Sequence, residues 1–165
     1  MIFKRRKKPR ACQPKPKALE KECLARLTDR LKKADYLPKA LIIKNRSSKL
    51  KMSQVILDFA EPFLAQIDEQ DDTAFREVID LAILGWNLAL LTESGRQELL
   101  DKIMAKPAPK IPRHYKQTLQ KKLDALIQRK QRFFADYRLA IIDYEIIASE
   151  DHHVLTVVTG SDFKF

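Results

Sequence analysis

Two carboxylates in one apolar segment are the first candidates for chemistry. Glu77 and Asp80 stand three residues apart within 74–91, so a helix there places them side by side, with Asn87 on the face of Asp80. A buried carboxylate in such a place has a raised pKa or a cationic partner, and acid–base sites are often built this way. The alternative is that this face meets water or pairs with an arginine of a basic helix. No His, Ser or Lys stands nearby in the sequence to complete a mechanism, so we favour the alternative and expect no catalytic residue.

A second candidate is the pair His152 and His153, which follows Glu150 and Asp151 and has metal-ligand chemistry. Adjacent residues of a strand point to opposite faces, so the two imidazoles would not readily share a metal on a strand. In a turn they could share one, but further ligands would have to come from elsewhere. We therefore expect a solvated hairpin turn, with no metal and no cofactor.

The segment 129–138 interleaves cations with Phe133, Phe134 and Tyr137. Cations neutralise phosphates and aromatic rings stack on unpaired bases, and this mixture suits single-stranded nucleic acid. The alternative is that the three rings belong to the core at a helix–strand junction and that only the charges are exposed. We favour this alternative for the rings and keep the charges as a candidate surface.

Charge is segregated along the chain into four blocks. The 165 residues hold 32 Lys+Arg and 22 Asp+Glu, which gives a net charge of +10. Residues 1–51 contribute +14, residues 52–101 contribute −9, residues 102–138 contribute +9 and residues 139–165 contribute −4. The basic balance favours a polyanionic partner, either nucleic acid or an acidic protein.

The N-terminal stretch 1–16 is basic, contains three prolines and carries only Ile2 and Phe3 as large apolar side chains after its first residue. It cannot bury enough surface to offset the entropy of ordering, so we expect a flexible arm. Together with the helix expected over 113–134, this arm forms the candidate nucleic-acid-binding surface. The predicted contacts are Lys4, Arg5, Arg6, Lys7, Lys8 and Arg10 in the arm and Lys121, Lys122, Arg129, Lys130 and Arg132 in the helix.

Hydrophobic periodicity predicts the elements that position these groups. The segment 74–91, capped by Asp72 or Thr73, is apolar almost all the way round, which indicates a central, buried helix. Other helices are expected over 17–35, over 53–68 with Ser53 as its cap and a break or kink at Pro62, over 94–105 with a Ser94–Gln97 capping box, and over 113–134 with Tyr115, Leu119, Leu123 and Leu126 buried.

Composition excludes several classes of protein. With 3 glycines in the chain, a glycine-rich phosphate loop or a many-hairpin fold is hard to build. The longest apolar stretch, within 78–91, is too short and too polar to cross a bilayer, so we expect no membrane association. Cys12 and Cys23 form no zinc-binding pattern, and we expect reduced thiols in a cytoplasmic protein, with Cys23 in the core.

The fold expected is therefore mainly α (α+β): a helical bundle around a buried central helix, with a C-terminal β-hairpin at about 138–160, all in one domain over 17–165. We expect the two basic helices to pack around the central one with their cationic faces outward and contiguous. Arg26, Arg30 and Lys33 would then lie on the same face as Lys121, Arg129 and Arg132.

The leading functional hypothesis is a non-enzymatic nucleic-acid-binding protein, associated with RNA or ribonucleoprotein rather than DNA. The alternative is a protein-interaction module or assembly factor with no nucleic-acid role, in which the charge blocks balance one another internally. A third hypothesis, an enzyme, would have to centre on Glu77, Asp80 or His152.

Overall fold

The computed structural model describes residues 16–33, 51–68, 71–105, 113–148 and 153–160. Within these ranges, five helices precede an antiparallel hairpin, which confirms the mainly helical α+β prediction. The elements are α1 (Pro16–Lys32), α2 (Met52–Leu64), α3 (Asp72–Leu90), α4 (Glu93–Ala105), α5 (Arg113–Phe133), β1 (Ala140–Ala148) and β2 (His153–Gly160). The expected arm lies outside the described residues, except for Pro16, which begins α1.

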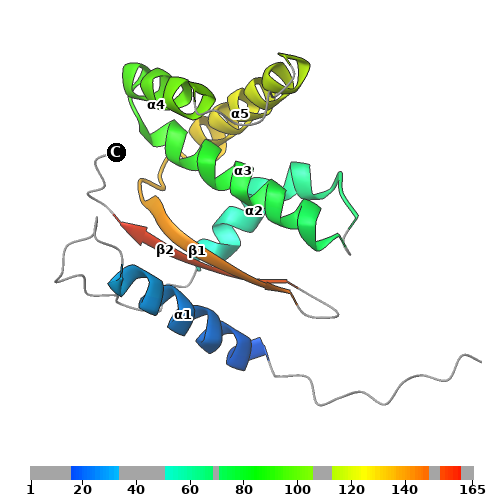
Figure 1. Cartoon of the computed structure of the whole chain (residues 1–165), viewed down its shortest axis with the longest axis vertical. Helices are drawn as coiled ribbons and strands as arrows, with labels where there is room; N and C mark the ends of the chain where they lie inside the picture. Colours follow the sequence, from blue (N-terminus) through cyan, green and yellow to red (C-terminus); the bar gives the residue numbers. More distant parts are fainter. Residues whose placement is uncertain (1–15, 34–50, 69–70, 106–112, 149–152, 161–165) are drawn as a thin grey trace, which may run out of the picture.

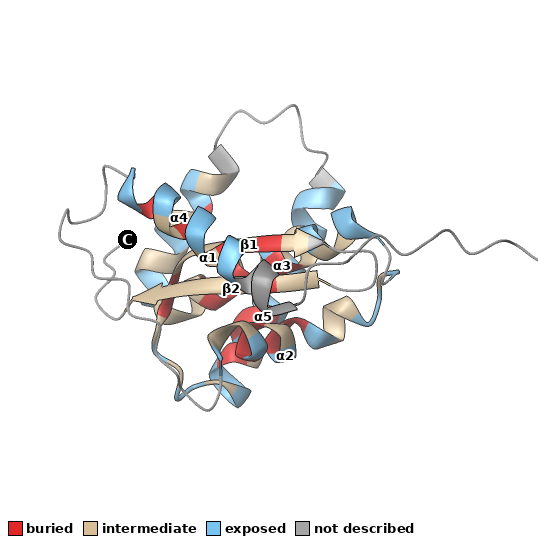
Figure 2. Ribbon diagram, turned by 90° about the horizontal axis from the view of Figure 1, so that it is seen from below, coloured by how far each residue is buried: buried red, intermediate tan, exposed pale blue. Residues whose placement is uncertain are grey.

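The elements are stacked in layers around the hairpin (Figure 1). Helix α1 covers one face of the two strands, while α2 and α3 cover the other, and α5 packs on the far side of α3. Leu100 of α4 joins a second apolar cluster with Leu88 of α3 and Leu123 of α5. Figure 2 shows the buried residues where helices face one another or the hairpin, and the exposed residues on the outer helix faces.

Helix α3 is the central helix, as its all-round apolar pattern predicts. It contacts α2, α5 and β1, and Ile79, Trp86 and Leu88 are fully buried. Gly85 allows α5 to approach closely, because a Cβ at this position would lie 2.7 Å from the Cβ of Leu126. These neighbours, together with Leu100 of α4, cover a helix that is apolar on most of its circumference.

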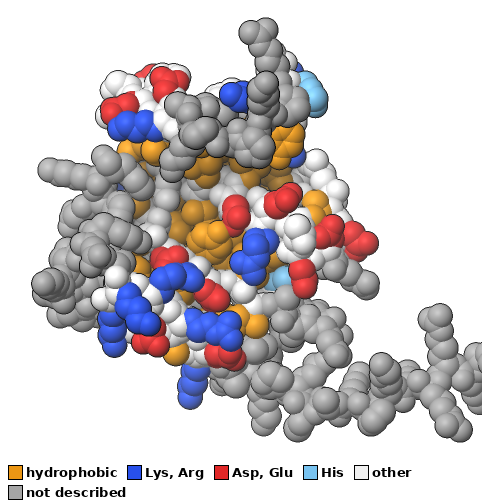
Figure 3. All heavy atoms as spheres, viewed as in Figure 1, with side chains coloured by type: hydrophobic (Ala, Val, Ile, Leu, Met, Phe, Trp, Pro, Cys, Tyr) orange, Lys and Arg blue, Asp and Glu red, His pale blue; other side chains and the backbone are white. Residues whose placement is uncertain are grey.

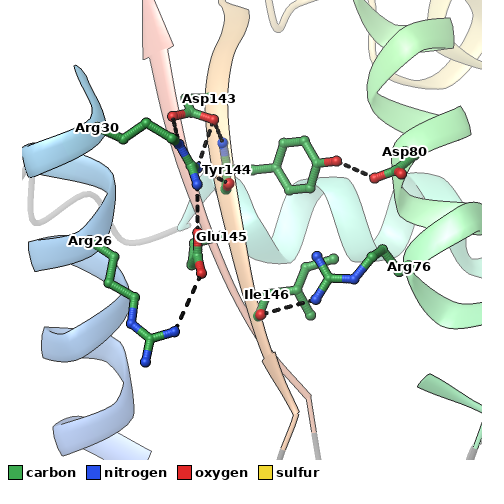
Figure 4. Close-up of polar contacts among 8 residues, drawn as sticks. All are labelled: Arg26, Arg30, Arg76, Asp80, Asp143, Tyr144, Glu145 and Ile146. Carbon is green, nitrogen blue, oxygen red and sulfur yellow. Dashed lines mark hydrogen bonds and ion pairs between the residues drawn. The ribbon is translucent and has the colours of Figure 1, made fainter. Parts of the chain in front are cut away.

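The prediction that both basic helices pack around α3 is wrong for α1. Helix α1 contacts β1 and β2, so the hairpin stands between it and α3. Arg30 Nε lies 2.6 Å from Asp143 Oδ2, and Arg30 Nη1 lies 2.9 Å from Glu145 Oε2 (Figure 4). Asp143 and Glu145 stand at alternate positions, so they share one face of β1. The arginines of α1 pair with this acidic face.

The hairpin falls where it is predicted, with Ile146 opposite Leu155 and an irregularity in register between Ile141 and Asp143. Ile146 and Leu155 point into the main core with α2 and α3. On the α1 side, Cys23 is fully buried, as predicted, and burial raises the pKa of its thiol. Each face of the two strands therefore has its own apolar cover.

Side chains of α3 occupy the outer backbone edge of β1. Trp86 Nε1 donates to the Leu139 carbonyl at 2.9 Å. Asn87 Nδ2 donates to the Ile141 carbonyl, and its Oδ1 accepts from the Ile141 N–H, both at 2.9 Å. One amide side chain thus makes both bonds that a neighbouring strand would make, and it ties the central helix to the hairpin.

Helix starts differ from the expected caps by a residue or two. Helix α2 begins at Met52 after Lys51 rather than being capped by Ser53. Asp71, not Asp72 or Thr73, caps α3 by accepting from the Ala74 N–H at 2.9 Å. In α4, Thr92 Oγ1 accepts from the Gly95 N–H, so the Ser94–Gln97 capping box is also wrong. At the starts of α3 and α4 several cap-competent residues stand together, and only the final packing selects one of them, whereas α2 begins without a side-chain cap.

Pro62 does not divide α2 into two helices, because a distant arginine replaces the hydrogen bond that the proline removes. Proline lacks the N–H that would reach the carbonyl four residues earlier, which is that of Asp58. Arg129 Nη2 donates to this carbonyl at 3.0 Å, and its Nε donates to the Phe59 carbonyl at 3.0 Å. Helix α2 therefore continues to Leu64.

We expect Arg129→Met to lower the free energy of unfolding by about 1–2 kcal/mol, because two carbonyls lose their donors while the aliphatic stem is kept. The loss should be smaller in a Pro62→Ala background, where the N–H introduced at position 62 bonds the Asp58 carbonyl. Urea unfolding of the four proteins of this cycle measures the coupling. Strictly additive losses would contradict the explanation.

Candidate nucleic-acid interface

Helix α5 sorts its side chains into a buried stripe and an outer face. Leu123, Leu126 and Ile127 are buried against α3 and α4. Tyr115 was predicted for the same stripe, but it is 57% exposed. The N-terminal end of α5 diverges from α3 (Figure 1), so the periodic position of Tyr115 has no neighbour in α3 to cover it.

Three of the predicted cations lie exposed on the outer face of α5. These are Lys121, Lys122 and Arg132, and within the described parts of the chain none of them pairs with a carboxylate. At about 100° per residue they fall within an arc of about 100°, and Lys121 and Arg132 are about 16 Å apart along the axis. The arrangement is a short row of cations with the geometry to follow a phosphate backbone.

Arg129, which was predicted to be a nucleic-acid contact, is half-buried, and its guanidinium donates to two backbone carbonyls of α2. Besides its bonds to α2, it lies 5.6 Å from the ring centre of Phe133 and 5.7 Å from that of Phe134. Its charge contributes to the potential over the outer face of α5. Its donors are directed to backbone carbonyls.

Lys130 was also predicted to be a contact, and here the structure requires a correction, because Lys130 is only 3% exposed. Its Nζ donates to the carbonyls of Phe134 and Tyr137, both at 2.7 Å, and lies 4.3 Å from the ring centre of Trp86. The lysine is placed one step round the helix from Arg129, on the core side. It caps the turn that leads from α5 to β1.

The three aromatic residues of the segment 129–138 divide between core and surface. Phe134 and Tyr137 pack against Trp86, with ring centres 6.0 and 6.3 Å from it, as the core interpretation predicts. Phe133, in contrast, is 60% exposed. Periodicity alone missed it, because Phe133 and Phe134 are adjacent and a helix turn sends them in different directions.

The cations of α1 do not extend this surface. Arg26 and Arg30 pair with Glu145 and Asp143 across the gap between α1 and β1. Figure 3 shows Lys and Arg side chains mixed with Asp and Glu over α1. Helix α1 and α5 lie on opposite sides of the hairpin and α3, so the predicted contiguous cationic face is wrong. The predicted arm contacts, Lys4, Arg5, Arg6, Lys7, Lys8 and Arg10, lie outside the described residues.

The carboxylates of α3 do not form a buried acid–base site. Asp80 is exposed, and its carboxylate accepts a hydrogen bond from the Tyr144 hydroxyl of β1 (Figure 4). Burial raises the pKa of the Tyr144 phenol, and the hydrogen bond to Asp80 raises it further. Glu77 is exposed as well. The contact joins α3 to β1 near the bond from Arg76 to the Ile146 carbonyl.

His153 belongs to β2 rather than to a solvated turn, and His152 lies outside the described residues. The His153 ring stacks on Phe75 at 4.0 Å, and its Nε2 lies 2.8 Å from Asp72 Oδ1. The histidine therefore joins the start of β2 to the first turn of α3. Among the described residues, no three His, Cys, Asp or Glu side chains gather in a way that could hold a metal ion.

In the described part of the chain, none of the helices has the length and apolar character needed to span a bilayer. Comparisons with protein-family models, with curated proteins and with solved structures found no match.

We expect Lys130→Met to lower the free energy of unfolding by about 2–4 kcal/mol at neutral pH, because two inward-facing carbonyls lose their donor. The matched control is Lys122→Met on the exposed face, which should change stability by less than about 0.5 kcal/mol. Denaturant unfolding monitored through Trp86 fluorescence measures both changes. Equal losses in the two variants would contradict a structural role for Lys130.

The same pair of variants makes a pH prediction. Burial lowers the pKa of Lys130 below its ordinary value of 10.5. Just below pH 10.5 the unfolded chain then binds more protons than the folded chain at this group, so its contribution to stability rises with pH. The stability difference between wild type and Lys130→Met should therefore increase as the pH approaches 10.5 from below. An unchanged difference would contradict it.

Proposed function

We propose that this protein is a non-enzymatic nucleic-acid-binding protein of the cytoplasm, that RNA, free or in a ribonucleoprotein, is its preferred partner, and that the outer face of α5 contributes to binding. The observation that carries the proposal is the row formed by Lys121, Lys122 and Arg132. These cations are exposed and share one face of a long helix. Such a row neutralises phosphates and releases their counterions.

Local charge supports the same choice of surface. Residues 102–138 carry a net charge of +9, while Arg26 and Arg30 of α1 pair with the carboxylates of β1. A phosphate backbone approaching α5 therefore meets cations without a competing carboxylate partner among the described residues. The basic stretch 1–16 adds seven cationic side chains to the attraction.

Removing the three cations together tests the proposal. We expect Lys121→Gln, Lys122→Gln and Arg132→Gln, combined in the full chain, to weaken binding of a single-stranded RNA and to reduce the slope of log K against log salt by about 2. Fluorescence anisotropy over a salt series measures both effects.

The matched control is Lys21→Gln and Lys32→Gln on α1 together with Lys33→Gln directly after it, which removes the same charge from exposed positions on the opposite side of the fold. This control should keep most of the affinity and the slope. Equal losses in the two triple variants would show that net charge alone drives binding. Absence of binding by wild type at low salt would overturn the proposal.

The pairing of α1 with β1 favours a second candidate, a protein-interaction module. Here the acidic residues of β1 neutralise part of the basic block internally, and the N-terminal stretch binds an acidic protein. Removal of residues 1–15, which stops just before α1, separates the two candidates. If RNA binding disappears with this stretch and the α5 triple variant binds like wild type, the interaction module is the better account.

A further inference from the structure

Phe133 combines exposure with two cationic neighbours in a way that the rest of the described surface does not repeat. It is the last residue of α5 and is 60% exposed. Arg132 lies 5.1 Å from the centre of its ring, and Arg129 lies 5.6 Å from it. Tyr115 is similarly exposed, at 57%, but among the described residues no cation lies over its ring.

We propose that the Phe133 ring is a stacking platform for an unpaired base, so that α5 takes single-stranded nucleic acid in preference to duplex. This inference rests on the proposed function and adds the class of nucleic acid to it. Aromatic rings bind bases through their faces, and every base has such a face. In a duplex the bases are already stacked and paired, so they do not reach an isolated ring on a helix.

The two arginine side chains differ in how firmly they are held. This difference allows a base to replace Arg132 on the Phe133 ring. Arg129 is fixed by its bonds to the Asp58 and Phe59 carbonyls. Arg132 is exposed and, within the described residues, has no hydrogen-bond or ion-pair partner. It can therefore leave the ring, bind the phosphate next to the stacked base and uncover a ring face. An exposed cation–π contact is thereby exchanged for base stacking and an ion pair, both of which favour the bound state.

The position of Phe133 on the helix matches the row of cations. Lys122 and Phe133 are eleven residues apart, close to three full turns, so they lie on nearly the same side of α5. A strand with one base on Phe133 can run along α5 toward Lys122 and Lys121. Stacking at one end and phosphate contacts along the helix then belong to one binding path.

The test compares a single-stranded RNA with a hairpin duplex of the same length and uses Phe133→Ala in the full chain. We expect wild type to prefer the single strand by about tenfold, the scale of one stacked base. Phe133→Ala should lose this preference while keeping the salt dependence that Lys121, Lys122 and Arg132 produce. The matched control, Tyr115→Ala, removes an equally exposed aromatic from the same helix and should keep the preference. The same pair of probes in DNA shows whether the platform distinguishes the sugar.

A second variant reports stacking directly. Phe133→Trp keeps a platform and adds an exposed indole, whereas Trp86 is fully buried. Saturation with the single strand should quench the added emission and preserve the preference over duplex.

The outcomes separate the two proposals. If wild type binds neither probe, the proposed function fails. If wild type binds both probes equally, if Phe133→Ala keeps the preference, if Tyr115→Ala loses it as well, or if the added indole is unaffected by a bound strand, the stacking platform is overturned. The proposed nucleic-acid binding then stands, and the α5 triple variant tests the role of the cations separately.

Discussion

A two-stranded hairpin has two faces and two backbone edges, and other elements must satisfy them before the strands are stable. In this protein that constraint determines where most of the helices lie. Helix α1 covers one face of the hairpin, while α2 and α3 cover the other. Trp86 of α3 bonds the carbonyl of Leu139, just before β1, and Asn87 bonds the outer edge of β1 at Ile141. The central helix therefore contributes both apolar burial and polar bonds to the hairpin.

The need of backbone carbonyls and strand carboxylates for hydrogen-bond donors also explains the positions of several cationic side chains. A backbone carbonyl without an N–H donor, or a carboxylate on a strand face, is a binding site for a basic side chain within the fold. Arg129 donates to the carbonyl that Pro62 leaves without a donor. Lys130 donates to two carbonyls of the turn after α5. Arg30 forms ion pairs with Asp143 and Glu145. Some of the chain's cationic side chains are therefore paired with carbonyls and carboxylates within the fold.

What remains is a smaller and more specific surface than the net charge suggests. Lys121, Lys122 and Arg132 stay exposed, because they lie outside the buried stripe of α5 formed by Leu123, Leu126 and Ile127. Phe133 is exposed at the end of α5, while Phe134 turns into the core beside Trp86. The candidate interface is therefore the part of the helix that the fold does not use.

The local sequence pattern was sufficient to predict the helices and strands, but it was insufficient to predict which of them pack against one another. The apolar circumference of 74–91 predicts the central helix, and the β-branched runs after Leu139 predict the hairpin. The spacing of Leu123 and Leu126 predicts the buried side of α5. These predictions succeed because hydrophobic periodicity and intrinsic propensity act over a few residues. Periodicity says which side of a helix is covered but not what covers it. Only the tertiary structure decided that α1 lies on the hairpin, since Arg30 and Asp143 are 113 residues apart. It also decided that Lys130 is buried while Lys121 and Lys122 stay exposed, because an internal acceptor for a cation exists only once distant carbonyls have been brought beside it.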